Sequence, residues 1–273
     1  MNKNIKIIIL AAGEGKRLLP ITQNTPKCLV KLFDKSLLNW QLEIYKKFNI
    51  NDISIVTGFK KEKINIKNLN YFHNPNFAET NMVETLFYAK KKFNETIIVS
   101  YGDIIFEERV FEKILLDDND ISLVVDKNWL EYWKLRFQNP LDDAESLKID
   151  SNGFITNIGQ KVGSLDEIEA QYIGLMKFKG EGLNKLINFY EKCKLNSKSG
   201  KNPLNPNLPF QNSYMTDLLR GMINEGHKIK SIPISNGWLE LDSFNDYLIY
   251  NEEKNRNKIK NFFNFDSNNL IRN

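Results

Sequence analysis

The feature that most constrains the fold is a short apolar run followed at once by a glycine-containing loop. Residues 5–10 include three consecutive isoleucines, and Gly13 and Gly15 come directly after them. A run of this kind is typical of a strand buried on both faces, as in a parallel sheet. Because open α/β sheets bind ligands beyond the carboxyl ends of their strands, the loop is the first candidate for a binding site.

The first half of the chain continues this alternation of strand and helix. Apolar residues at helical spacing over 37–48, with Ser36 placed to cap, predict a helix, and residues 53–57 predict a second buried strand. Asn81, with Glu84 three residues later, resembles a capping box. Further helices are expected over 82–91 and 106–116, and further strands over 97–100 and 121–125. The fold class predicted is therefore α/β, a doubly wound, mostly parallel, Rossmann-like mixed sheet flanked by helices.

The pattern changes after Asp126. Two strand-like segments flank residues 150–153 and predict a β-hairpin. The expected elements are hairpin strands over 146–149 and 154–158, helices over 183–193, 215–225 and 244–262, strands over 228–233 and 238–241, and a loop over 196–209. We therefore expect a single domain over 1–263, with halves 1–126 and 127–263, a small hairpin and helical insertion in the second half, and a polar, frayed tail over 264–273.

Composition excludes several classes of protein. A formal net charge of +4 over 273 residues is too small and too evenly spread to predict nucleic-acid binding. Cys28 and Cys193 form no CxxC pattern, which disfavours a zinc site or a disulfide framework. The apolar run over 7–12 is shorter than the core of a signal peptide, and no stretch approaches the roughly 20 apolar residues that span a bilayer. We expect a cytoplasmic protein with no membrane insertion.

The loop after the first strand has the chemistry of an anion site. Gly13 and Gly15 let the backbone approach an anion, while Arg17 and Lys27 supply positive charge. A dinucleotide fingerprint, GxGxxG, would need a third glycine where Leu18 stands and would run straight into a helix. A Walker loop would end in GK[ST], which is absent. The alternative to an anion site is a glycine turn carrying surface cations.

The whole loop resembles a long motif, LxAAGxGxRLxPxTxxxPKxLV, of the nucleotidyltransferases that make nucleotide-activated sugars and phospho-alcohols. The matching residues are Leu10, Ala11, Ala12, Gly13, Gly15, Arg17, Leu18, Pro20, Thr22, Pro26, Lys27, Leu29 and Val30. The resemblance implies that Arg17 and Lys27 are catalytic and contact the reacting phosphates. It implies a nucleotide site formed by Leu10, Ala11, Ala12, Gly13, Glu14, Gly15, Lys16, Arg17, Asn81 and Gly102. Lys16 stands where many members carry Thr.

Two aspartates match the metal-binding positions of that family. Asp103 follows the strand over 97–100, and Asp242 follows the late strand over 238–241. Carboxylates with phosphate oxygens are the ligands that Mg²⁺ prefers, so these residues are the predicted magnesium ligands. Each could instead cap the helix that follows it. A transfer between phosphates needs cations and positioning rather than a side-chain nucleophile, and this fits a chain with two histidines and no evident triad.

The second half is expected to hold the acceptor. The family resemblance places Lys161 on the acceptor's phosphate, with a solvated surface lysine as the alternative. The predicted acceptor-binding residues are Lys161, Trp129, Trp133, Glu169, Tyr172 and Glu240. The tryptophans could recognise a cationic group by cation–π contact, or they could be the buried face of an amphipathic helix. Asn81 likewise has two expected roles, in recognising the base and in capping a helix.

The segments WxxYW, NPxFAETN and QYIGL are more similar to cytidylyltransferases acting on phosphocholine or aminoalkylphosphonates than to hexose-1-phosphate enzymes. The resemblance implies a Mg²⁺-dependent transfer of CMP from CTP to a small phosphorylated or phosphonate acceptor, with release of pyrophosphate, for surface glycan or lipid decoration. Residues 1–126 would bind the nucleotide and residues 127–263 the acceptor. A sugar-1-phosphate nucleotidyltransferase and a non-catalytic nucleotide-binding module stay as alternatives, and the protein is expected to be a monomer or a homodimer.

Overall fold

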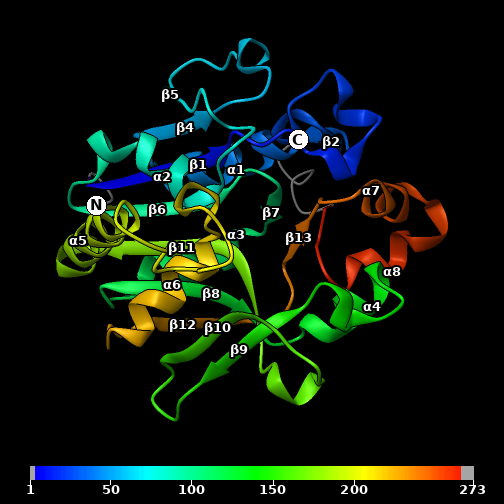
Figure 1. Ribbon diagram of the computed structural model, residues 1–273. Helices are drawn as coiled ribbons and strands as arrows, with labels where there is room; N and C mark the ends of the chain where they lie inside the picture. Colours follow the sequence, from blue (N-terminus) through cyan, green and yellow to red (C-terminus); the bar gives the residue numbers. More distant parts are fainter. Residues whose placement is uncertain (1–3, 266–273) are drawn as a thin grey trace.

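The computed structural model describes residues 4–265 and contains a central seven-stranded sheet (Figure 1). Its strands, in spatial order, are β12 (Lys230–Ile234), β8 (Ile121–Asp126), β11 (Gln171–Lys179), β6 (Thr96–Tyr101), β1 (Ile5–Ala11), β4 (Ile53–Thr57) and β5 (Asn70–His73). β11 runs antiparallel to both of its neighbours, and all other pairs are parallel. The predicted mostly parallel mixed sheet is confirmed.

The isoleucines of β1 explain why this strand lies at the centre. Side chains of a strand point alternately to the two faces of the sheet. Ile7 and Ile9 enter the hydrophobic core on one face, and Ile8 and Leu10 enter the core on the other. The three isoleucines are fully buried, as expected for a strand covered on both sides.

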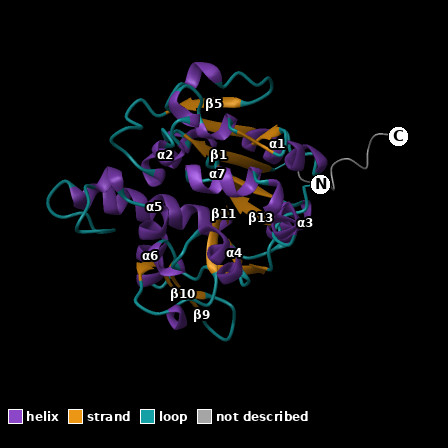
Figure 2. Ribbon diagram, turned by 90° about the vertical axis from the view of Figure 1, so that its right-hand side faces the viewer, coloured by secondary structure: helices purple, strands orange, loops and turns teal. Residues whose placement is uncertain are grey.

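Helices cover both faces of the sheet (Figure 2). They are α1 (Leu37–Lys47), α2 (Met82–Tyr88), α3 (Glu108–Leu116), α4 (Trp129–Arg136), α5 (Gly180–Ser197), α6 (Met215–Asn224), α7 (Phe244–Asn251) and α8 (Arg256–Lys260). Residues of α1, α3, α4, α7 and α8 belong to one core, and residues of α2, α5 and α6 belong to the other. Ser36 caps α1 as predicted, since its hydroxyl accepts the Asn39 N–H at 3.1 Å.

Three two-stranded pairs complete the fold. They are β9 (Glu145–Ile149) with β10 (Ile155–Lys161), β7 (Ile104–Phe106) with β13 (Trp238–Glu240), and β2 (Lys31–Leu32) with β3 (Lys35–Ser36). The first pair is the predicted hairpin, which lies at the foot of Figure 1. The pair β7–β13 was not predicted, and the helix expected from Phe106 begins at Glu108 because Phe106 pairs with Trp238. This pairing brings the ends of two distant segments together.

The final helix is broken where one continuous helix was expected. α7 ends at Asn251, Glu252 is extended, and a 3₁₀ turn over Glu253–Asn255 leads into α8. Tyr250 and Ile259 are both buried. Residues nine positions apart face opposite sides of a straight helix, at about 100° per residue. The break turns both side chains into the core.

Two smaller expectations are also corrected. Asn81 does cap α2, through its own Oδ1 and the Met82 N–H at 2.8 Å, but Glu84 forms no capping box. Its carboxylate instead accepts from the Tyr190 hydroxyl at 2.7 Å and pairs with Lys194 at 3.0 Å. α2 ends at Tyr88, before the expected Lys91.

Two residues of the predicted frayed tail, Asn264 and Phe265, are packed against the rest of the chain. The Asn264 N–H donates to Glu107 at 2.8 Å, and Phe265 is buried with its ring stacked on Phe33 at 4.2 Å. The rest of the predicted tail, residues 266–273, lies outside the described residues. Over residues 4–265, no helix has the length and apolar character needed to cross a membrane.

Candidate active site

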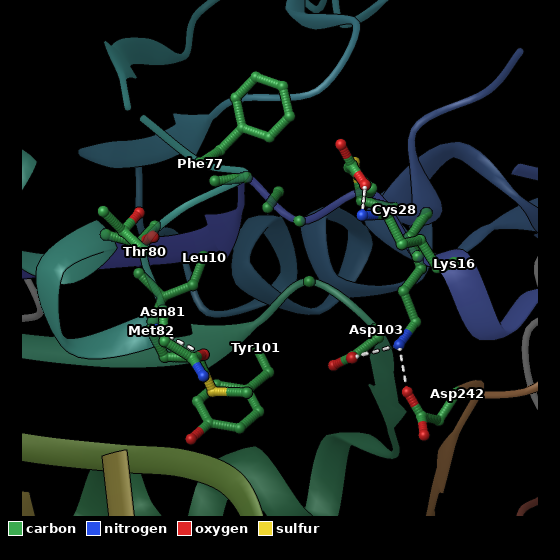
Figure 3. A pocket seen from close by; sticks show the side chains of 18 of the residues that line it. Leu10, Lys16, Cys28, Phe77, Thr80, Asn81, Met82, Tyr101, Asp103 and Asp242 are labelled. Carbon is green, nitrogen blue, oxygen red and sulfur yellow. Dashed lines mark hydrogen bonds and ion pairs between the residues drawn. The ribbon is translucent and has the colours of Figure 1, made fainter. Parts of the chain in front are cut away.

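A cavity of about 360 Å³ opens at the carboxyl ends of β1 and β6 (Figure 3). It is the place where an open α/β sheet binds ligands. Every residue predicted to bind nucleotide lines it, namely Leu10, Ala11, Ala12, Gly13, Glu14, Gly15, Lys16, Arg17, Asn81 and Gly102. The predicted catalytic Lys27 and the predicted metal ligands Asp103 and Asp242 line it as well. Segments far apart in the sequence therefore meet at one cavity.

The glycines have distinct tasks in the loop. Gly15 is left-handed, with φ of 64°, and a Cβ there would come within 3.1–3.2 Å of Thr22 and Lys27. The Thr22 hydroxyl donates to the Gly15 carbonyl at 2.7 Å and fixes this turn. Apart from Gly13 itself and its two chain neighbours, no atom of residues 4–265 lies within 4 Å of a Cβ added at Gly13, which lines the cavity, so the backbone there is accessible. The loop is rigid at Gly15 and accessible at Gly13, which suits an anion-binding backbone.

Gly102 sets the floor of the cavity between β1 and β6. Its N–H donates to the Leu10 carbonyl at 2.9 Å, and a Cβ there would lie 2.8 Å from that same oxygen. Only glycine permits this approach, because real Cβ atoms essentially never come so close. The turn that carries Asp103 is thereby held against the loop.

Charges converge at the end of the cavity nearest α7. Lys27 Nζ lies 2.7 Å from Asp103 Oδ2 and 2.8 Å from Asp242 Oδ1. Arg17 Nη2 lies 2.7 Å from the second oxygen of Asp242. The Lys27 side chain is only 15% exposed, whereas that of Arg17 is 69% exposed. In Figure 3, the dashed lines that end on Asp103 and Asp242 mark the two ion pairs of Lys27.

Lys27 keeps its charge despite being buried. Burial lowers its pKa, but the negative charges of Asp103, Asp242 and Glu240 outweigh that effect and raise the pKa above its ordinary value. The ammonium group therefore stays protonated across the physiological range. The ammonium group neutralises part of the charge of the two aspartates and is positioned to bind a phosphate.

The two aspartates fit a magnesium ion that is completed by phosphate oxygens. Asp103 lines the cavity, and its buried Oδ1 has no hydrogen-bond partner among residues 4–265, so one strong acceptor of this residue is unpaired. Within residues 4–265, no group of three or more His, Cys, Asp or Glu side chains forms a ready metal site. Mg²⁺ is commonly bound by one or two carboxylates together with substrate phosphates, and this arrangement matches that pattern.

Glu240 extends the charged cluster toward the second half of the chain. Burial is the main cause that raises its pKa, to about 7, and the neighbouring Asp242 and Asp103 add to the effect. Arg136, whose Nη1 lies 2.9 Å from Glu240 Oε2, acts in the opposite direction. Glu240 was predicted to contact the acceptor, and its position beside the Lys27 cluster is compatible with that role.

The opposite end of the cavity is formed by the segment before α2 and by the first turn of α2. Phe77, Ala78, Thr80, Met82 and Thr85 line it together with Asn81. A Cβ on Gly58 would lie 2.6 Å from the Cβ of Phe77, so this glycine lets Phe77 pack over the end of the sheet. Asn81 both caps α2 and lines the cavity, so its capping role is confirmed and its role toward a base stays a prediction.

The tryptophans of α4 lie in the core. Trp129 and Trp133 are each 4% exposed, and their rings pack edge to face at 5.8 Å. The Trp133 ring already has a cation beside it, because Arg136 lies 5.4 Å from its centroid. The expected cation–π contact with an acceptor is therefore wrong for this structure, and the alternative, a helix that buries its tryptophans, describes α4.

Three other predicted acceptor residues differ in their positions. Lys161 is exposed and pairs with Glu145 across the hairpin, at the open end where β9 begins and β10 ends. The Tyr172 ring packs edge to face at 5.9 Å on Tyr101, which lines the cavity. Glu169 stabilises the hairpin, since its carboxylate accepts a hydrogen bond from the Ile149 N–H at 3.1 Å. Lys161 and Tyr172 stay compatible with acceptor binding, whereas Glu169 has a structural partner.

Two carboxylates beside the site were not predicted. Burial raises the pKa of Asp143, whereas Glu145 is an exposed residue of β9. Asp143 accepts a hydrogen bond from the Trp133 indole at 3.2 Å. The charges of Arg17 and Asp242 also act on its pKa, Arg17 to lower it and Asp242 to raise it. The only signal in the sequence was a short acidic run, over 142–145, directly before the hairpin.

The model of the family described as nucleotidyl transferase matches residues 6–255. A CTP:phosphoglutamine cytidylyltransferase of Campylobacter jejuni is 38% identical over 250 residues, which cover 88% of this chain and 96% of that protein. A choline-phosphate cytidylyltransferase of Streptococcus pneumoniae is 36% identical over 107 residues, which cover 38% of this chain and 47% of that protein. The solved structure of a CTP:phosphocholine cytidylyltransferase from Streptococcus pneumoniae has the same fold, with a TM-score of 0.69 at 23% identity, over 89% of this chain and 96% of that one.

Proposed function

Because the chain belongs to the nucleotidyl transferase family, we propose that it transfers CMP from CTP to a small phosphorylated or phosphonate acceptor and releases pyrophosphate. The observation that carries this proposal is the cluster of Lys27, Arg17, Asp103 and Asp242 at one end of a glycine-lined cavity. The choice of CTP is supported by the relative that is 38% identical over most of its length, a cytidylyltransferase.

The reaction is an exchange at the α-phosphorus of the nucleotide. An oxygen of the acceptor's phosphate forms a new bond to that phosphorus, and the bond to the oxygen that bridges the α- and β-phosphates breaks. The electron pair leaves with pyrophosphate. The acceptor oxygen is already anionic, so no side chain has to activate it. What the protein supplies is positive charge and alignment.

Each residue of the cluster has a task that follows from its position. The open backbone at Gly13 and the left-handed turn at Gly15 receive the triphosphate. Lys27 is buried and fixed, so it holds the reacting phosphates, while the exposed Arg17 can follow the phosphates as charge shifts toward pyrophosphate. Asp103 and Asp242 would hold Mg²⁺, which when bound supplies further positive charge to the phosphate oxygens.

We place the acceptor beside the hairpin. Phosphoglutamine and choline phosphate, the acceptors named for two relatives, each carry an anionic phosphate and a separate cationic group, the α-ammonium of an amino acid or a quaternary ammonium. Lys161 is suited to the phosphate as a point charge. Its cross-strand neighbour Glu145, together with Glu240, offers a carboxylate for the cationic end. Residues 1–126 would thus bind the nucleotide and residues 127–263 the acceptor, within a single domain over 1–263.

The setting proposed for this activity is the cytoplasm, where the product would serve surface glycan or lipid decoration. Cys28 and Cys193 are both free and buried, which is compatible with a reducing compartment.

A matrix of four nucleoside triphosphates against phosphorylated acceptors tests the proposal. Pyrophosphate release is measured with Mg²⁺ present, and the acceptors are phosphoglutamine, choline phosphate, 2-aminoethylphosphonate and glucose 1-phosphate. We expect release with CTP and an acceptor that carries nitrogen. Release with glucose 1-phosphate alone would assign the protein to the sugar-1-phosphate enzymes, and no release with any pair would overturn the proposal.

A further inference from the structure

A buried ion pair lies directly behind the Asp242 carboxylate. Arg136 of α4 donates from Nε to Asp246 Oδ1 at 2.9 Å and from Nη2 to Asp246 Oδ2 at 3.1 Å. Both side chains are 1% exposed. The guanidinium also lies 5.1–5.4 Å from the ring centroids of Tyr132, Trp133 and Phe137. The two hydrogen bonds and the three neighbouring rings together fix the orientation of the Arg136 guanidinium.

Asp246 also holds the backbone of Asp242, the residue that faces the active site. Its Oδ2 accepts the backbone N–H of Asp242 at 3.1 Å and that of Ser243 at 2.8 Å. The Ser243 hydroxyl in turn accepts the Asp246 N–H at 3.1 Å, which completes a capping box at the start of α7. The main chain of Asp242 is therefore attached to Arg136 through one carboxylate.

The residue two positions earlier is held from the same side. The Glu240 N–H donates to the Tyr132 hydroxyl at 2.9 Å, and the Tyr250 hydroxyl donates to the Glu240 carbonyl at 2.9 Å. The hydroxyl groups of Tyr132 and Tyr250 are also hydrogen-bonded to each other. With Arg136 on the Glu240 carboxylate, the segment 240–243 is fixed on its buried side, and the Asp242 carboxylate is left facing Lys27 and Arg17.

We propose that Arg136 and Asp246 are positioning residues, which hold the Asp242 carboxylate where Lys27 and Mg²⁺ need it. This inference rests on the proposed function. A bond that orients a ligating carboxylate is worth about 10–100-fold in metal affinity or activity in other metal sites. The pair also explains the aromatic segment of α4, whose rings surround the guanidinium of Arg136.

The rival explanation is that the pair only stabilises α7. A matched control separates the two, because Asp117 and Lys177 form another buried aspartate–cation pair, with side chains 10% and 2% exposed. Asp117 precedes β8, at the amino edge of the sheet, whereas the active site lies at the carboxyl edge. Asp117→Asn therefore loses a largely buried ion pair without touching the segment 240–243.

The test is a calorimetric titration of CTP into each variant at a series of Mg²⁺ concentrations, without acceptor, beside thermal unfolding. For Asp246→Asn we expect the Mg²⁺ concentration that gives half-maximal CTP affinity to rise about 10-fold. For Asp117→Asn we expect a lower unfolding temperature and a Mg²⁺ midpoint within about two-fold of wild type, since that substitution leaves the ligands in place. Tyr250→Phe removes the hydrogen bonds to the Glu240 carbonyl and to the Tyr132 hydroxyl but leaves the Arg136–Asp246 pair, so it should raise the midpoint by less than Asp246→Asn does.

Steady-state rates give a second measurement. Asp246→Asn should lower kcat with CTP and acceptor saturating, and leave KM for the acceptor near its wild-type value. If Asp246→Asn and Tyr250→Phe both melt at lower temperature with an unchanged Mg²⁺ midpoint and kcat, the pair is merely structural and the inference fails. If wild type itself binds no CTP with Mg²⁺, the proposed function fails instead.

Discussion

The two halves of the molecule encode their functional residues in different ways. In the nucleotide half, one segment, residues 10–28, supplies half of the cavity lining, and every residue predicted to bind nucleotide lines the cavity. In the acceptor half, the predicted aromatic residues Trp129 and Trp133 are buried around an internal cation. The comparison teaches that glycines and charges spaced along one loop specify a site directly, whereas aromatic residues on a helix describe packing first.

The largest effect is expected from Lys27, at the centre of the nucleotide half. Lys27→Ala removes the buried cation that faces the phosphates, and we expect turnover to fall about 10²–10³-fold. Circular dichroism should show the wild-type content of helix and strand. Wild-type rates in this variant would break the assignment of the whole loop.

A smaller loss is expected from Asp103, which lines the cavity and has one oxygen without a hydrogen-bond partner in the described part of the chain. Asp103→Asn should shift the Mg²⁺ dependence of activity to higher concentration and lower the rate about 10–100-fold. The measurement is a magnesium titration of pyrophosphate release. A titration curve that overlays that of wild type would remove Asp103 from the metal site.

The same reasoning applied to α4 predicts a change in stability. Trp133→Phe removes the indole N–H bond to Asp143 and part of a packed ring, so the free energy of unfolding should fall by about 1–2 kcal/mol. KM for the acceptor should stay unchanged. A large rise in that KM, with unfolding as in wild type, would restore the predicted acceptor contact and remove the contrast between the two halves.

The smallest effect is expected from Lys161, which is exposed. Lys161→Ala should raise KM for the acceptor about five-fold, the equivalent of about 1 kcal/mol for one charge-assisted contact. KM for CTP should not change, which separates this residue from the loop. Equal KM values for the acceptor in both proteins would make Lys161 a solvated surface lysine.

Local patterns were enough to predict the loop and five strands of the sheet, whereas β5 and β11 were not predicted. Strands such as β1 and the Ser36 cap of α1 depend on neighbours in sequence, and the phosphate loop is contiguous. Contacts between distant segments were not accessible in this way. The pairing of Phe106 with Trp238, the break after Asn251 and the Arg136–Asp246 pair all depend on residues that meet only in the folded chain.

Calorimetric titration of CTP into the purified protein, with and without Mg²⁺, tests the central claim most directly. The claim is that a glycine-lined loop, two cations and two aspartates together hold a nucleoside triphosphate. We predict one binding site for CTP that tightens when Mg²⁺ is added. Failure of CTP, ATP, GTP and UTP alike to bind in the presence of Mg²⁺ would contradict the account.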